Sequence, residues 1–287
     1  MSLPRLVCPN DPQLLTGLGG RPVAVRVNDL ALAAGAAANV RESGNELYCV
    51  IVEASAPLAE LEFDAEHKGV PLAVMVPSMG KFRDVAPKLD LMRELNLRVY
   101  LPCDDAENLT GMRLLSSVGV HTGADFANGV ADWDALSDLM TYAVLGRVPH
   151  ASIEPFTFIA TNYDPQSYLD WGATQFDDPR RFLHLDENGR IALSRAELAA
   201  GVFAAQSITE LGEPAEFRAI RVRANAWREF FVDNHPCSAC RAWRVCLGKF
   251  ADDADGCADF FAEAIEVAAE HRRLCAAPPP RAPLWQP

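Results

Sequence analysis

The 287-residue sequence lacks several features that would assign it to a class at once. It contains no apolar run of the ~18–20 residues that a membrane span requires, and none of signal-peptide length near Met1. Its 26 basic residues are outnumbered by 39 acidic ones, for a formal net charge of −13. General binding to nucleic acid or to an anionic membrane needs a basic surface, which this balance does not supply. We therefore expect a cytoplasmic protein that binds neither.

Common catalytic motifs are absent too. The sequence has no GXGXXG or Walker-type phosphate loop, no Gly-x-Ser-x-Gly nucleophile elbow and no His-Glu-x-x-His zinc motif. Nucleotide-dependent enzymes and these hydrolases therefore have no support in the sequence. The composition, 49% apolar and 23% charged, is that of a folded globular protein.

The first half of the chain alternates short β-branched runs with amphipathic segments. This alternation predicts an α/β domain of parallel βα units over residues 1–150, a shortened or degenerate (β/α) barrel, because five units are too few for eight strands. The expected strands are Pro22–Val27, Tyr48–Val52, Pro71–Val76, Arg98–Leu101 and Gly119–Thr122. The expected helices are Asp84–Leu95, Glu107–Ser117 and Asp132–Leu145, the last capped by Asp132.

The second half differs in character and predicts a small α+β domain over residues 180–275. Residues 151–179 are expected to form an extended connection, and residues 276–287 a proline-rich tail. Phe182–Leu193 carries two apolar runs around Asp-Glu-Asn-Gly, which predicts a β-hairpin. Helices are expected at Ser194–Ala205, Phe217–Phe231 and Ala258–Arg273.

Four of the eight cysteines gather within 21 residues. Cys237 and Cys240 form a Cys-x-x-Cys pair, Cys246 follows, and Cys257 comes after Gly256, whose freedom would let the backbone approach closely. In a reducing compartment such a group indicates a metal site rather than disulfides, with Cys257 preferred over Cys275 as fourth ligand. An iron–sulfur cluster, a zinc ion and simple buried thiols all remain open, although zinc ribbons usually pair two Cys-x-x-Cys knuckles.

Residues about 180–275 resemble a SPASM domain, the cluster-binding extension of radical SAM peptide-modifying enzymes. The matching features, in family order, are the hairpin Leu185–Ile191, the Leu211-Gly212 step, a helix with Trp227, and Cys237-x2-Cys240-x5-Cys246-Leu247-Gly248. The resemblance implies one auxiliary [4Fe–4S] cluster, with Cys237, Cys240, Cys246 and Cys257 as ligands.

The sequence also departs from that family. Ala192-Leu193-Ser194 stands where the hairpin usually ends in a cysteine, and Phe250 where a further cysteine is expected, so a second auxiliary cluster is not implied. The radical SAM triplet CxxxCxxC is missing, and Cys49 and Cys103 are isolated near expected strand ends, as core thiols are. The chain thus resembles stand-alone SPASM-domain proteins of peptide-maturation systems, the GeoRSP system in particular.

That resemblance implies a non-catalytic iron–sulfur accessory protein. It would bind a partner radical SAM/SPASM enzyme, a precursor peptide or both, with electron relay as an added capacity. Two other hypotheses stay open. One is an autonomous enzyme that uses an open cluster iron or a cleft around His121 and Asp125; the other is a zinc-stabilised structural interaction module. His235, two residues before Cys237, is a further donor or ligand candidate.

Overall fold

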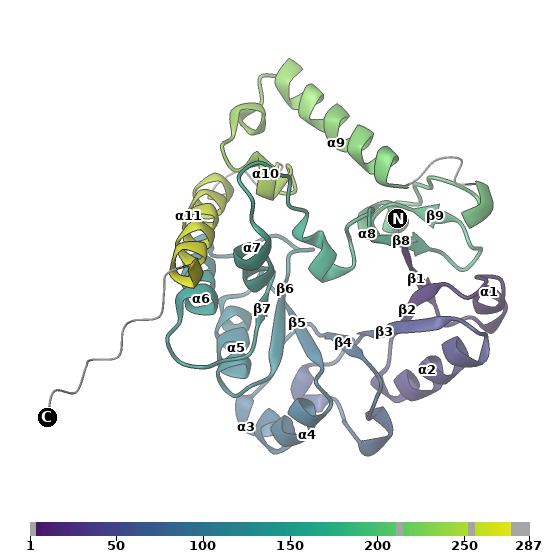
Figure 1. Cartoon of the computed structure of the whole chain (residues 1–287). Coiled ribbons are helices and arrows are strands. Elements are labelled where there is room, and N and C mark those ends of the chain that lie inside the picture. The colour runs from purple at the N-terminus through teal and green to yellow at the C-terminus, as the bar shows by residue number, and fades with distance from the viewer. Residues whose placement is uncertain (1–3, 211–214, 252–255, 277–287) are drawn as a thin grey trace, which may run out of the picture.

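A single nine-stranded sheet organises the protein (Figure 1). The computed structural model describes residues 4–210, 215–251 and 256–276. The strands lie in the order β7-β6-β5-β4-β3-β2-β1-β8-β9, and every neighbouring pair is parallel except β8–β9. Their bounds are β1 Arg5–Pro9, β2 Pro22–Val27, β3 Glu46–Glu53, β4 Leu72–Met75, β5 Arg98–Pro102, β6 His121–Asp125, β7 Ile153–Glu154, β8 Phe182–Leu185 and β9 Ile191–Ala192. The predicted α/β class is confirmed.

The connecting helices of the first half cover one face of this sheet (Figure 1). Their bounds are α1 Pro12–Thr16, α2 Ala33–Glu42, α3 Phe82–Val85, α4 Leu89–Glu94, α5 Ala106–Ser117 and α6 Trp133–Leu145. Asp132 accepts a hydrogen bond of 3.0 Å from the Ala135 N–H and so begins α6 as predicted. Among the described residues, no helix has the length and apolar character to cross a membrane.

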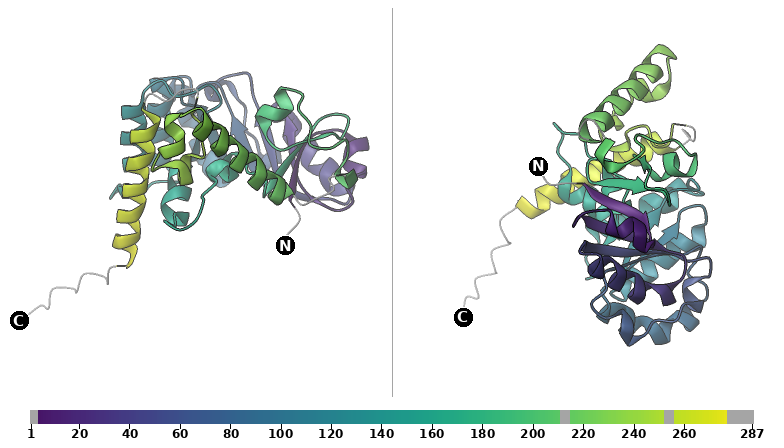
Figure 2. Two further views of the ribbon diagram at one scale, coloured as in Figure 1. Left: turned by 90° about the horizontal axis from the view of Figure 1, so that it is seen from above. Right: turned by 90° about the vertical axis from the view of Figure 1, so that its right-hand side faces the viewer.

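The second half adds further helices, which pack partly on the first half. They are α7 Phe156–Asn162, α8 Arg195–Ala199, α9 Ala215–Val232, α10 Trp243–Cys246 and α11 Cys257–Ala276, with short 3-10 turns that include η5 Trp171–Gln175 and η7 Pro236–Ala239. Helix α11 packs on α6 and α7, whereas α9 projects from the body in both Figures 1 and 2. The main hydrophobic core and the sheet therefore continue across residue 150.

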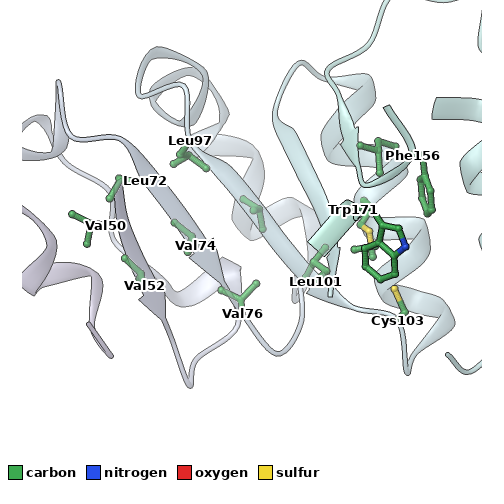
Figure 3. Close-up of a cluster of buried hydrophobic side chains, with 14 of the residues drawn as sticks. Val50, Val52, Leu72, Val74, Val76, Leu97, Leu101, Cys103, Phe156 and Trp171 are labelled. Carbon is green, nitrogen blue, oxygen red and sulfur yellow. The ribbon is translucent and has the colours of Figure 1, made fainter. Parts of the chain in front are cut away.

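The main core lies between the sheet and its helices. Figure 3 shows Val50, Val52, Leu72 and Val74, whose side chains leave alternate positions of β3 and β4 toward this layer. Trp171 and Cys103 belong to the same core (Figure 3). The opposite face of the sheet carries a smaller cluster, made of Val7, Ala24, Cys49, Ile51, Ala73, Met75, Tyr100, Phe176 and Phe182.

The predicted hairpin is confirmed, and so is its turn. Strands β8 and β9 pair antiparallel, Gly189 has a φ of 76°, and the Asp186 carboxylate accepts hydrogen bonds from the Asn188 and Arg190 backbone N–H groups at 3.0 and 2.8 Å. On its other side, β8 pairs with β1, which the sequence did not predict.

Two predictions about the second half are wrong in part. Residues 151–179 are not simply extended, because α7 and η5 occupy much of the segment and bury Phe156, Ile159 and Trp171. The helix expected over Ser194–Ala205 covers only Arg195–Ala199, since the chain turns at Gly201, whose φ is 70°, and Ala205 returns to pair with Ile191. The predicted tail lies outside the described residues except for Ala276, and so does the Leu211-Gly212 step.

Candidate functional site

The three clustered cysteines lie on two consecutive short turns. Pro236 begins η7, and His235 caps it, because the His235 Nδ1 accepts the Cys237 N–H at 3.2 Å. The Cys240 N–H reaches the Cys237 carbonyl at 3.3 Å, and Cys246 ends α10. These tight turns fold the Cys-x-x-Cys pair back toward Cys246. His235 thus positions the backbone through Nδ1.

The chain turns sharply after Cys246. Leu247 and Gly248 both adopt left-handed backbone conformations, with φ of 59° and 75°. A β carbon at Gly248 would lie 2.9 Å from Trp243 Cζ3 and 3.0 Å from Phe230 Cε2, so a larger residue does not fit this turn. The turn therefore needs a glycine at position 248, which the Cys246-Leu247-Gly248 sequence supplies.

This turn directs backbone amides at one thiol. Burial raises the pKa of the Cys246 thiol, and the backbone N–H groups of Phe250, Gly248 and Lys249 lower it, because they stabilise the thiolate. Several amides around one sulfur make a site suited to a negatively charged thiolate ligand.

Cys237 interacts electrostatically with each of the other two thiols. Its pKa is raised by burial and then by the neighbouring Cys240. Cys237 in turn raises the pKa of Cys246. Like charges on neighbouring thiolates repel one another unless a cation is shared between them. Cys237 thus interacts with both Cys240 and Cys246.

The structure separates the two candidates for a fourth ligand. Cys257 is buried at the start of α11, and its sulfur lies 4.0 Å from the carbonyl oxygen of Phe250, the residue whose amide acts on Cys246. Cys275 lies 18 residues further along the same helix, about 27 Å away at 1.5 Å per residue. It is exposed, with its sulfur 3.7 Å from the His271 Nε2. Cys257 is therefore the better placed of the two.

As the side chains stand in residues 4–210, 215–251 and 256–276, no group of three or more His, Cys, Asp or Glu residues has the geometry to hold a metal ion. The donor chemistry nevertheless fits a thiophilic group such as zinc or an iron–sulfur cluster, because the four candidate ligands are all thiols. Cys237, Cys240, Cys246 and Cys257 would hold such a group.

The cysteine segment borders a cavity of about 670 Å³. Arg26, Glu53 and Asp125 reach it from the carboxyl ends of β2, β3 and β6, and Lys249 and Phe250 from the turn after Cys246. The carboxyl ends of parallel strands are where βα folds usually bind ligands.

Lys249 joins the cysteine turn to the wall of this cavity. Its ammonium lies 3.3 Å from the Asp170 Oδ1 and 4.9 Å from the centroid of the Trp171 ring. Sequence reasoning noted Lys249 only as a cation near the cysteines, and it did not single out Arg26 or Glu53. The available signal was a charged residue near the end of each of two otherwise apolar strands.

His121 and Asp125 do not share a cleft, so that part of the enzyme hypothesis is wrong. They begin and end β6, which separates them by about 13 Å at 3.3 Å per residue. Asp125 lines the cavity beside Lys249, whereas His121 lines another cavity at the opposite edge of the sheet. Their even spacing puts them on one face but at opposite ends of the strand.

The isolated cysteines are core residues, as predicted. Cys8, Cys49 and Cys103 are all buried, and burial raises the pKa of each thiol, to about 12 for Cys8 and Cys49. Comparison with models of protein families, with curated proteins and with solved structures finds no match for this chain. Function is therefore inferred from its residues and their geometry.

Proposed function

We propose that this chain is an iron–sulfur accessory protein of a radical SAM peptide-modification system in a reducing cytoplasm. Cys237, Cys240, Cys246 and Cys257 would hold one [4Fe–4S] cluster. The observation that carries the proposal is the left-handed turn after Cys246, which brings three backbone amides near a thiol that interacts with Cys237, the partner of Cys240 in the Cys-x-x-Cys pair. A buried thiol that serves only as a core residue has no need of such an environment.

The strand order supports a reduced barrel of the radical SAM type. Strands β1 to β7 follow one another in both sequence and space, are parallel, and have helices on one side. The hairpin β8–β9 and the cysteine turns would then be the SPASM-like part. Cys8, Cys49 and Cys103 are isolated and buried, so they do not replace the missing catalytic triplet.

A bound cluster would supply one-electron transfer. The residues of the chain would provide the ligands and adjust the reduction potential. Amides near Cys246 favour added negative charge, so they raise the potential. Lys249 lies three residues after Cys246 and lines the neighbouring cavity, with its ammonium paired to Asp170.

Helix α9 supports the partner-binding part of the proposal. Trp227 and Phe231 stack with ring centroids 5.8 Å apart, yet 40% and 65% of their surfaces stay exposed. Val232 beside them is 75% exposed. Exposed aromatic residues on a projecting helix are typical of a protein–protein interface. We assign this surface to the partner radical SAM/SPASM enzyme or the precursor peptide.

Anaerobic purification with iron, sulfide and zinc analysis tests the cluster. We expect about four iron and four sulfide per chain, with the visible absorption of a [4Fe–4S] cluster. Cys246→Ser should lose both elements, and Cys275→Ser, which alters an exposed thiol, is the matched control. One zinc per chain without sulfide would support the structural zinc module instead.

Co-expression with a radical SAM/SPASM enzyme encoded beside this chain tests the accessory role. The native chain should co-purify with the enzyme, and the Trp227→Ser/Phe231→Ser double variant should not. Tyr168→Ser, at another site with 53% exposure, is the control. Equal recovery of the native chain and the double variant would remove α9 from the interface.

A further inference from the structure

A second cavity, of about 660 Å³, opens at the amino-terminal edge of the sheet. Arg98 and His121 line it from the first positions of β5 and β6, and Tyr48 and Cys49 from the first half of β3. Within residues 4–210, 215–251 and 256–276, no aspartate or glutamate lines it, although the sequence carries 39 of them and a net charge of −13. A wall that excludes carboxylates in so acidic a protein favours an anionic ligand.

Arg98 brings a guanidinium to this cavity, where it interacts with the Tyr100 hydroxyl and with Glu154. Its Nε is buried and has no hydrogen-bond partner among the described residues. The nearest carboxylate is Glu154, whose Oε1 lies 3.6 Å from the Arg98 Nη2, too far for a good hydrogen bond. The other Glu154 oxygen accepts the Phe158 N–H at 3.0 Å. The Arg98 side chain as a whole is 34% exposed and lines the cavity, so the outer N–H groups of its guanidinium are the donors that a ligand there could reach.

His121 adds a second donor next to the first. The register of β5 and β6 sets Arg98 directly beside His121. The His121 Nδ1 accepts the Ser152 N–H at 3.3 Å and lies 2.8 Å from the Ser152 Oγ, so the neutral ring carries its proton on Nε2. Burial and then Arg98 lower the pKa of His121, which keeps the ring neutral.

Apolar side chains complete the cavity. Leu72, Ala73, Leu95 and Phe176 lie among its walls, so the space suits a hydrocarbon body as well as a charged group. A volume of this size is within the usual range for small-molecule sites, ~300–1,000 Å³.

We propose that this cavity binds a small organic carboxylate. Its carboxylate would accept hydrogen bonds from Arg98 and the Nε2–H of His121, and its apolar body would lie against Leu72 and Phe176. The site is about the length of a strand from the cavity beside Lys249, and it does not depend on a metal at the cysteines. It would therefore act as a separate ligand site.

Histidine-detected NMR tests the site in the native chain. The probes are benzoate, phenylacetate, 4-hydroxybenzoate and hexanoate, each compared with its neutral amide. At least one acid should shift the His121 Cε1–H resonance, assigned with His121→Gln, while the other five histidines serve as internal controls. The matching amide should bind at least tenfold more weakly. Equal binding of acid and amide, or no shift with any acid, would overturn the proposal.

Variants then test the role of Arg98. Arg98→Gln/Glu154→Gln removes both charges together, so no unpaired buried carboxylate is left, and it should weaken binding of the best acid roughly tenfold or more. Arg113→Gln removes an exposed arginine that lies over Tyr142, and should bind as the native chain does. If the double variant does not fold, the comparison of acid with amide in the native chain decides alone. A folded double variant with native affinity would refute the assignment to Arg98.

Discussion

Gly123 on β6 faces the ring of Tyr100 on the neighbouring strand β5, and a β carbon at position 123 would overlap that ring. Tyr100 is 1% exposed. It belongs to the smaller cluster on the face of the sheet opposite the main core, where it packs against Phe176 with ring centroids 6.2 Å apart. The absence of a side chain on one strand thus makes room for the largest residue on the next.

Gly123→Ala should therefore destabilise the protein. Overpacking of a filled core costs about 1–3 kcal/mol in the free energy of unfolding, which urea denaturation would measure. Gly35→Ala is the matched control, because Gly35 lies in helix α2 with open space around it. That change should stabilise by about 0.5–1 kcal/mol. Equal effects of the two substitutions would contradict the packing argument.

Alkylation should divide the cysteines by burial and pKa. In the metal-free reduced chain at pH 8, iodoacetamide should modify exposed Cys275 first. Cys8 and Cys49 should stay unmodified until the chain unfolds, because a pKa of about 12 leaves roughly one thiol in ten thousand ionised. Peptide mass spectrometry would measure the extent of modification at each cysteine. Modification of Cys49 at the rate of Cys275 would contradict the protection of this thiol by its raised pKa.

The same two thiols should make stability fall at alkaline pH. An unfolded thiol ionises near pH 9 and the folded ones near 12, so the stabilisation is complete below about pH 9 and is lost as the pH rises toward 12. Each thiol contributes a slope of up to about 1.4 kcal/mol per pH unit. Urea denaturation of Cys8→Ala/Cys49→Ala should show lower stability at pH 8 but a shallower alkaline decline. An unchanged slope would mean that other groups, such as Tyr100, dominate.

Cys257→Ser distinguishes accessory protein from enzyme. If Cys257 is the fourth ligand, this variant should lose iron and sulfide as Cys246→Ser does. Cys275→Ser should keep both, since its thiol lies at the far end of α11. Native cluster content in Cys257→Ser, measured anaerobically, would instead indicate three protein ligands and an open iron, which is the requirement of the autonomous-enzyme hypothesis.

Local patterns in the sequence were sufficient to predict strands β2 to β5 closely. Pro22–Val27 was placed with its observed bounds, and Asp132 and Gly189 marked a helix start and a turn correctly. In each case the determinant lies within a few residues: an apolar run, a capping carboxylate or a positive φ.

Features that depend on distant residues escaped prediction. Strand β1 was missed, and its partner β8 lies about 180 residues away in the chain, so no local pattern reports their pairing. Helix α7 was read as extended, because its seven residues give only two turns of periodicity. The cysteines could be proposed as a site from spacing, whereas the cavity at Arg98 and His121 exists only through the register of β5 and β6.

The pairing of β8 with β1 has a consequence for synthesis of the protein. One side of β1 presents unpaired backbone groups until residues 182–185 have left the ribosome. At ~5–20 residues per second, that wait lasts roughly ten to forty seconds. During this time the nascent sheet has an open parallel edge that another chain could occupy. The late hairpin is therefore the element that protects the growing protein from self-association.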